Sequence, residues 1–263
     1  MLKARSPWQV TRAVWYAMFM RELVARTMAD RMAWFWMVFE PIAIVAVLVT
    51  VRTVIMSRER LIQNAEFIPW LVIGLMGFFL FRENMFRLMG AVDANKALYA
   101  YRQVKPIDGV LVRSLVESLL RSFIFLLFIS AGLLLGMRMN PDNALLAIWV
   151  WISLWLLGLG AGLVLSVVSP LVPEIGKIIR IMSLPLLLLS GVIIPISILP
   201  HHLQYYILLN PIPHGIEYLR QSFFSHYPLV NGVDLNYLWF WSLSMLALGL
   251  LMHIRFEYKL KSL

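Results

Sequence analysis

The sequence predicts an all-α integral membrane protein with six membrane-spanning helices. Residues 144–168 carry no charged side chain, and a helix needs only about 20 apolar residues to cross a bilayer. Hydrophobic residues make up 61% of the 263-residue chain, and the mean hydropathy is +0.79. A water-soluble domain of this length could not cover so much apolar surface. The function must therefore be sought in a membrane-embedded protein.

Apolar stretches mark the expected spans in order. They lie at about residues 32–51, 67–89, 110–137, 144–168, 175–199 and 237–254. Together they predict a transmembrane domain over about residues 32–255, followed by a short cytoplasmic tail, 256–263. Residues 1–31 contain six Lys/Arg residues and no uninterrupted apolar core, so we expect no cleavable signal peptide.

The distribution of basic residues predicts the orientation. Seventeen of the 23 Lys/Arg residues fall on the side of the amino terminus and five on the other side. Cytoplasmic loops carry the excess of basic residues in membrane proteins, so both termini are expected in the cytoplasm. The net charge of +9 lies beside the spans, where anionic lipids attract it, which argues against nucleic acid as a partner. The chain has no cysteine and therefore no disulfide.

Residues 8–30 predict an amphipathic helix on the inner membrane surface. Its apolar side would carry Val10, Val14, Ala17, Met18, Val24, Ala25 and Met28, and its polar side Arg5, Arg12, Glu22, Arg26 and Asp30. Arg21 falls within the apolar side, where we expect it to reach water or to pair with a carboxylate.

A polar segment, residues 91–108, separates the second and third spans. Asp93 is an expected N-cap of a short helix that ends before Pro106. The segment contains mixed charges and aromatic residues: Asn95, Lys96, Tyr99, Tyr101, Arg102 and Lys105. It is either a docking element for a partner protein or a solvated loop.

The connection between the fifth and sixth spans is rich in proline. Two short pieces, residues 203–209 and 212–224, are each too short to cross a membrane. We expect both to be helices that dip into the outer leaflet and narrow the external mouth of a pathway. Glu217 and Arg220 are spaced for an ion pair.

Charged residues near the inner ends of the spans allow two interpretations. Arg113, Glu117 and Arg121 share one face of the third span, because they are spaced by four residues. They could form an internal ion-pair ladder, or line an inner entrance that meets an anionic substrate. Arg82, Glu83 and Arg87 lie at the corresponding end of the second span.

Signatures of catalysis are absent from the sequence. It contains no phosphate-binding loop, no H-E-x-x-H and no G-x-S-x-G pattern. The histidines are His201, His202, His214, His226 and His253. None has carboxylates at metal-ligand spacing, so we expect neither a metal site, nor a cofactor, nor an enzyme.

An ordered set of motifs resembles the membrane subunit of ABC-2 type exporters, within them the KpsM/BexB/CtrC family that exports capsular polysaccharide in Gram-negative bacteria. The motifs are Arg21-Glu22-Leu23 with Arg26, Trp34 with Glu40-Pro41, residues 81–86, residues 95–98, residues 104–108, Ser190-Gly191 with Pro195 and Leu199-Pro200, and Asn210-Pro211 with His214 and Arg220. The resemblance covers nearly the whole chain.

The resemblance implies a homodimer of six-span subunits in the bacterial inner membrane that passes a lipid-linked acidic polysaccharide between its two copies. Two copies of a cytoplasmic ATPase (KpsT-like) would hold ATP and Mg²⁺. A periplasmic co-polymerase (KpsE-like) and an outer-membrane exporter (KpsD-like) would be further partners. Residues 8–30 would be the interface helix, residues 91–105 the coupling helix and residues 200–224 the periplasmic gate, with Pro200, His201, His202, Tyr205, Asn210, Pro211, His214, Glu217 and Arg220.

Aromatic residues would suit a conduit for a sliding glycan. Trp149, Trp151 and Trp155 in the fourth span are candidates, although they could instead anchor the protein in the outer membrane interface. Two other functions stay open. One is an ABC-2 permease for O-antigen, teichoic acid, a drug or a lipid, and the other is a membrane enzyme that acts on lipid-linked sugars.

Overall fold

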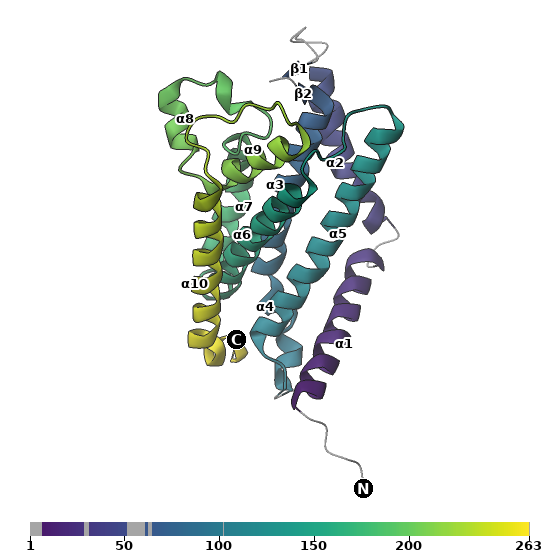
Figure 1. The fold of residues 1–263 in the computed structure, drawn as a ribbon. Helices are drawn as coiled ribbons and strands as arrows, with labels where there is room; N and C mark the ends of the chain where they lie inside the picture. The colour runs from purple at the N-terminus through teal and green to yellow at the C-terminus, as the bar shows by residue number, and fades with distance from the viewer. Residues whose placement is uncertain (1–6, 29–31, 52–60, 63–64, 102, 263) are drawn as a thin grey trace.

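The computed structural model describes residues 7–28, 32–51, 61–62, 65–101 and 103–262, and this part of the chain is almost entirely helical (Figure 1). The helices are α1 (Pro7–Met28), α2 (Ala33–Thr50), α3 (Phe67–Met89), α4 (Ala91–Ala94), η2 (Lys96–Ala100), α5 (Pro106–Leu134), α6 (Ala144–Leu171), α7 (Pro173–Leu188), η3 (Ile196–Ile198), α8 (His201–Ile207), α9 (Pro211–Phe223) and α10 (Leu235–Lys261). Two short strands, β1 (Leu61–Ile62) and β2 (Ala65–Glu66), pair antiparallel.

Four helices of the described residues are long and apolar enough to cross a membrane: α3, α5, α6 and α10. The all-α, multi-pass class is therefore confirmed. α2 is apolar but has 18 residues, and α7 has 16. The expected continuous fifth helix to residue 199 is wrong, because α7 ends at Leu188. Gly191 then adopts a left-handed backbone (φ +67°), which turns the chain away from the helix axis.

The other boundaries follow local signals. α3 matches the predicted span, and α5 begins at Pro106, where proline suits the first helical position. Asp108 Oδ2 accepts a hydrogen bond from the Lys105 amide (2.9 Å) and so caps α5. α10 continues to Lys261, so the residues expected as a tail extend the last helix.

α3 lies at the centre of the molecule and is almost entirely buried. α6 packs closely against it, because a Cβ atom at Gly158 would lie 2.7 Å from the Phe81 carbonyl oxygen. Gly160 permits a similar approach to α10, as small residues do in membrane helix pairs. α6 therefore joins α3 and α10 into one core.

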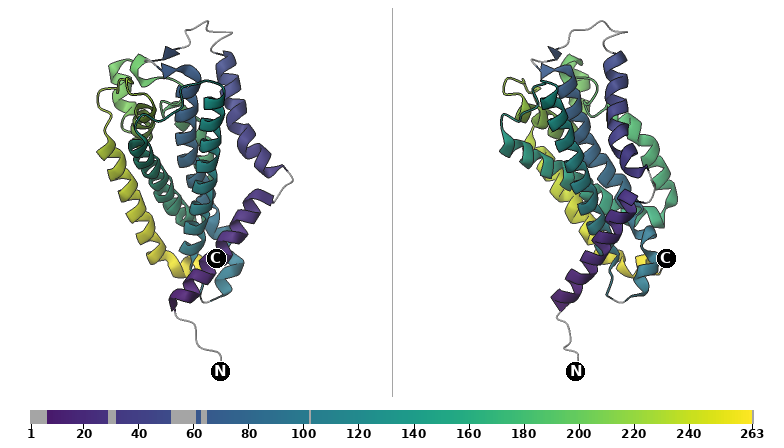
Figure 2. Two further views of the ribbon diagram at one scale, coloured as in Figure 1. Left: turned by 45° about the vertical axis from the view of Figure 1, so that its right-hand side comes forward. Right: turned by 90° about the vertical axis from the view of Figure 1, so that its right-hand side faces the viewer.

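The two ends of the molecule differ. Both termini lie at the end that carries α4, whereas α8 and α9 lie at the opposite end (Figure 1). We refer to these as the α4 end and the α8 end. Figure 2 shows α1 inclined to α2 and lying against the part of α5 nearest the α4 end.

Candidate functional site

The loop between α3 and α5 is held together by two of its own polar residues. Asn95 is 1% exposed, and its Nδ2 donates a hydrogen bond to the Ala91 carbonyl oxygen (2.8 Å). The buried Tyr99 hydroxyl donates to the Val92 carbonyl oxygen (3.1 Å), and burial raises the pKa of Tyr99 to about 12. Asn95 and Tyr99, expected to contact a partner, therefore face inward instead.

Other predicted docking residues lie on the surface of this loop. Lys96, Tyr101 and Lys105 are exposed, and Lys96 Nζ lies 3.0 Å from Asp93 Oδ1. The expected N-cap role of Asp93 is wrong, because α4 begins before it and has no side-chain cap. Arg102 lies outside the described residues.

Four polar contacts link α1 to the loop and to α5. Arg21 Nη2 donates to Asn95 Oδ1, Trp15 Nε1 to Asp108 Oδ1 (3.0 Å), Arg113 Nη2 to Glu22 Oε2 (3.2 Å) and Arg26 Nε to Glu117 Oε2 (3.1 Å). Glu22 and Arg26 were predicted to face water, but they face α5 instead. Arg21 is exposed, which agrees with the expectation that it reaches water, and its polar partner is the Asn95 amide and not a carboxylate. Together the contacts hold α1, the loop and α5 as one unit.

The charged residues of α3 and α5 form a continuous ion-pair network. Arg82 contacts Glu40 (2.8 Å) and Glu83 (2.6 Å), Arg121 contacts Glu83 (3.4 Å) and Glu117 (3.0 Å), and Arg87 lies 3.8 Å from Glu83. This arrangement agrees with the predicted internal ion pairs for Arg121 and Glu117. Arg113 pairs with Glu22 of α1 and not with Glu117. The carboxylates thus bridge arginines of different helices, as buried charges require.

A cavity of about 220 Å³ lies beside this network. Its lining is Glu22, Ala25, Arg26, Arg87, Arg113, Val116 and Glu117. Three guanidinium groups face two carboxylates, so the cavity keeps an excess of positive charge. All four predicted entrance arginines are nevertheless engaged in ion pairs.

At the α8 end, α9 is anchored by a fully buried arginine. Arg220 donates hydrogen bonds to the carbonyl oxygens of Trp70 (3.3 Å), Gly191 (2.8 Å) and Val192 (2.9 Å), and to Glu217 Oε1 (2.9 Å). The Tyr227 hydroxyl donates to Glu217 Oε2 (3.0 Å) and accepts from Trp70 Nε1 (3.1 Å). The predicted Glu217–Arg220 pair is confirmed, but both residues are buried and cannot line an opening.

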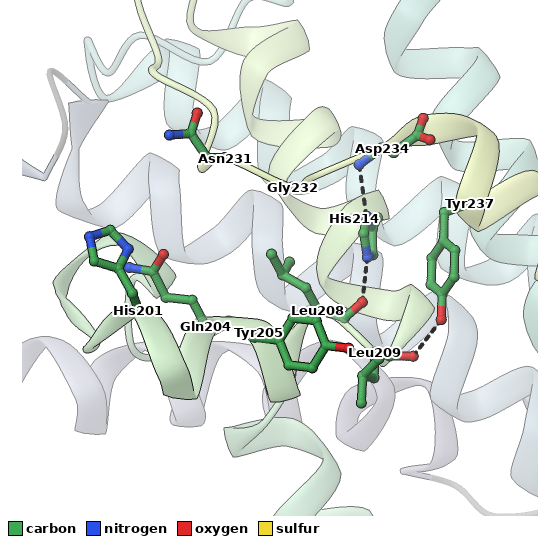
Figure 3. Close-up of a pocket in the computed structure, with 10 residues that line it drawn as sticks. All are labelled: His201, Gln204, Tyr205, Leu208, Leu209, His214, Asn231, Gly232, Asp234 and Tyr237. Carbon is green, nitrogen blue, oxygen red and sulfur yellow. Dashed lines mark hydrogen bonds between the residues drawn. The ribbon is translucent and has the colours of Figure 1, made fainter.

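A pocket of about 440 Å³ lies beside α8 (Figure 3). Its lining is His201, Gln204, Tyr205, Leu208, Leu209, His214, Asn231, Gly232, Asp234 and Tyr237. The Asp234 amide donates to His214 Nδ1 (2.8 Å), and His214 Nε2 contacts the Leu208 carbonyl oxygen (2.8 Å). The Tyr237 hydroxyl donates to the Leu209 carbonyl oxygen (2.8 Å). The two carbonyls that directly follow α8 are thereby satisfied by α9 and α10.

The remaining predicted gate residues have local roles. Pro200 precedes α8, and Asn210 caps α9 by accepting a hydrogen bond from the Ile212 amide (3.1 Å), with Pro211 as the first helical residue. His202 is exposed and does not line the pocket. The two short helices are present as predicted.

The three candidate tryptophans of α6 do not form one row. Trp151 stacks on Phe125 of α5 (centroids 4.6 Å apart) and its Nε1 donates to Ser122 Oγ (2.8 Å). Trp155 Nε1 donates to Ser114 Oγ (3.0 Å). Trp149 is exposed and packs against Trp239 of α10. Trp151 and Trp155 therefore serve packing between α5 and α6.

Sequence reasoning missed several residues of these sites. Trp70 and Tyr227 lie 157 positions apart, and nothing local to either marks them as partners. Asp234 could have been found, because it precedes an apolar helix and caps it by accepting from the Asn236 amide. Among the described residues, no group of three or more His, Asp or Glu side chains could hold a metal ion.

Comparison with known proteins agrees with the fold. Residues 13–224 match the family model described as ABC-2 type transporter. The chain is 32% identical to the polysialic acid transport protein KpsM of Escherichia coli over 95% of this chain and 96% of the relative. It is 25% identical to the capsule polysaccharide export inner-membrane protein CtrC of Neisseria meningitidis, with 92% and 90% of the two chains covered.

A third relative is similar over most of its length. The capsule polysaccharide export inner-membrane protein BexB of Haemophilus influenzae is 25% identical over 90% of this chain and 88% of its own. The family model and the relatives agree on a transport subunit and not an enzyme. The chain belongs to the ABC-2 type transporter family.

Proposed function

We propose that this chain is the inner-membrane permease of an ATP-driven exporter of lipid-linked acidic capsule polysaccharide. The observation that carries the proposal is similarity along nearly the full length to three proteins whose names state capsule polysaccharide or polysialic acid transport. A separate ATPase would hold ATP and Mg²⁺, because the sequence has no phosphate-binding loop.

The exposed side chains of the loop between α3 and α5 form the docking surface for that ATPase in this proposal. Lys96, Tyr101 and Lys105 are accessible, whereas Asn95 and Tyr99 keep the loop rigid. Contacts of the loop with α1 support the idea that motion of the ATPase would move α1 and α5 together.

The proposed membrane layout has six spans: α2, α3, α5, α6, α7 and α10. Both termini and α4 would face the cytoplasm, which fits their position at one end of the molecule (Figure 1). α8 and α9 would dip into the outer leaflet and narrow the exit. Two copies of the chain would enclose the passage and meet a periplasmic co-polymerase and an outer-membrane exporter.

A loop replacement tests the proposal. Replacing residues 94–104 with a Gly/Ser segment should abolish surface polysaccharide while the protein still inserts in the membrane. The narrower variant Lys96→Ala/Tyr101→Ala removes only exposed side chains and should reduce co-purification of the ATPase without loss of thermal stability. Tyr206→Ala, an equally exposed tyrosine at the α8 end, is the matched control. Normal export by the loop replacement would refute the docking assignment.

A permease for another glycan is the second candidate, because the family model alone does not specify the cargo. Genes beside this one discriminate the two. Capsule transferases and a periplasmic co-polymerase favour capsule export, whereas O-antigen or teichoic acid synthesis genes favour the alternative.

A further inference from the structure

The pocket beside α8 has a mainly apolar lining with a few polar groups, and it is nearly uncharged. Its volume of about 440 Å³ lies within the range of small-molecule sites, about 300–1,000 Å³. The lining contains one carboxylate, Asp234, and no Lys or Arg. Asp234 Oδ1 already accepts a hydrogen bond from the Asn236 amide (2.8 Å). The pocket therefore suits a ligand with neutral hydrogen-bonding groups and not an anion.

His214 contributes no free donor to this pocket. A backbone amide can only donate, so the Asp234 amide requires an unprotonated Nδ1 on His214. The proton then resides on Nε2, which donates to the Leu208 carbonyl oxygen (2.8 Å). The imidazole is thus a neutral part of the lining with both ring nitrogens occupied, and the pocket offers no ligand set for a metal ion.

Three polar side chains of the lining keep hydrogen-bonding capacity. The side-chain amide of Asn231 and the hydroxyl of Tyr205 make no hydrogen bond within the described residues. Gln204 donates through Nε2 to the Leu199 carbonyl oxygen (2.8 Å), which leaves its Oε1 as an acceptor. These groups supply donors and acceptors for hydroxyl groups.

Two tyrosine rings complete the lining. Tyr205 is 67% exposed, and Tyr237 is held by its hydroxyl bond to Leu209. Figure 3 shows His201 and Asn231 at one side of the pocket and Asp234 and Tyr237 at the other. Tyrosine offers a rigid, amphipathic surface that loses little conformational entropy on binding.

Flat apolar rings beside neutral amide and hydroxyl groups match the chemistry of a pyranose, which has C–H faces and hydroxyl edges. We propose that this pocket is a binding site for one sugar residue of the exported polymer, an inference that rests on the proposed function. Acidic groups of the polymer would point away from Asp234 into solvent. The few neutral contacts of the pocket make binding weak, so the polymer can slide from one residue to the next.

Saturation-transfer NMR tests the site on the full-length protein in lipid nanodiscs. The probe is a set of short oligosaccharides cut by mild acid from the surface polysaccharide of the host. Tyr205→Ala and Asn231→Ala should each weaken binding about tenfold, since each removes one ring or hydrogen-bond contact. Tyr16→Ala is the matched control, because Tyr16 is also 67% exposed but lies on α1 and does not line the pocket.

Three results would overturn the sugar site. The first is equal binding by the wild type and Tyr205→Ala. The second is an equal loss of binding in the control Tyr16→Ala. The third is full competition by polyacrylate, a polyanion without hydroxyl groups. Because Tyr205 and Asn231 are exposed, both variants should keep the wild-type elution profile.

A deletion strain separates this inference from the proposed function. If deletion of the gene abolishes surface polysaccharide but Tyr205→Ala binds oligosaccharides as well as the wild type does, only the sugar site is refuted. Unchanged surface polysaccharide on deletion refutes the proposed function.

Discussion

The guanidinium carbon of Arg220 lies 3.5 Å from the ring centroid of Trp70, although 150 positions separate the two residues. Arg220 is 0% exposed and donates to four acceptors from α3, α9 and the turn after α7. A charge buried so completely is tolerated only when all of its hydrogen bonds are made. This arginine therefore fixes α9 relative to α3.

Arg220→Met should destabilise the protein strongly, because it leaves the carboxylate of Glu217 buried without its cation. Removal of one partner from a buried pair costs about 3–5 kcal/mol. The measurement is thermal stability by size-exclusion chromatography after heating, where the midpoint should fall by several degrees.

The double variant Glu217→Gln/Arg220→Met is the control for charge. It removes both charges and keeps a group that can bond to Tyr227. Its midpoint should lie between those of Arg220→Met and the wild type. A double variant as unstable as Arg220→Met would contradict the uncompensated charge as the cause.

Gly74→Ala should disturb the packing of Arg220, and with it of α9, against α3 and so lower the stability of the protein. A Cβ atom at Gly74 would lie 2.4 Å from Arg220 Nη2, and overpacking of this kind costs about 1–3 kcal/mol. Gly90→Ala is the matched control, because nothing lies within 4 Å of its Cβ position. The heating assay should show a lower midpoint for Gly74→Ala alone. Equal midpoints for both variants would argue against close packing of Arg220 on α3.

The sequence predicted features that depend on local composition. The α3 span matched because its apolar run is bounded at both ends, and the Glu217–Arg220 pair followed from helical spacing. The predicted end of the fifth span at residue 199 is wrong. Apolar residues continue past Gly191, but the left-handed backbone of Gly191 does not allow the helix to continue. Hydropathy does not record backbone conformation.

Tertiary contacts explain what the sequence could not predict at the candidate sites. Asn95 lies in a polar segment and therefore looked exposed, but α1 covers it and supplies Arg21 as its partner. Likewise Glu22 looked solvent-facing on a helical wheel, because the wheel does not contain Arg113 of α5. Each case requires knowing which helix lies alongside.

Reversal of one charge between α1 and α5 should release α1. In the wild type, Arg113 Nε lies 2.5 Å from Glu22 Oε1. Glu22→Arg therefore places two cations side by side, whereas Glu22→Arg/Arg113→Glu restores a pair of opposite charges. Met18 is 5% exposed and packs near Gly109 of α5, and the chain has no native cysteine. Maleimide labelling of Met18→Cys should therefore become several-fold faster in the single reversal and return towards the original rate in the double reversal. Equal rates in all three backgrounds would show that this ion pair does not hold α1.

The packing of α8 should weaken in acid through His214. Burial lowers the pKa of His214 below its usual 6.5, an effect that exceeds the opposing influences of the hydrogen bond to the Leu208 carbonyl oxygen and of Asp234. The pKa of His214 is lower in the folded protein than in the unfolded chain. The stability that neutral His214 contributes is therefore fully present above about pH 6.5 and is lost as the pH falls below that value. Protonation of Nδ1 would remove the acceptor for the Asp234 amide.

Cysteine labelling at Gln204, which is 8% exposed on α8, measures this opening. The rate for Gln204→Cys divided by that for the exposed Tyr206→Cys removes the pH dependence of the thiol itself. This ratio should rise from about pH 7.5 to about pH 5.5. With His214→Gln, whose amide can donate to the Leu208 carbonyl oxygen but does not titrate, the ratio should stay constant. An equal rise in both backgrounds would assign the acid sensitivity to another group.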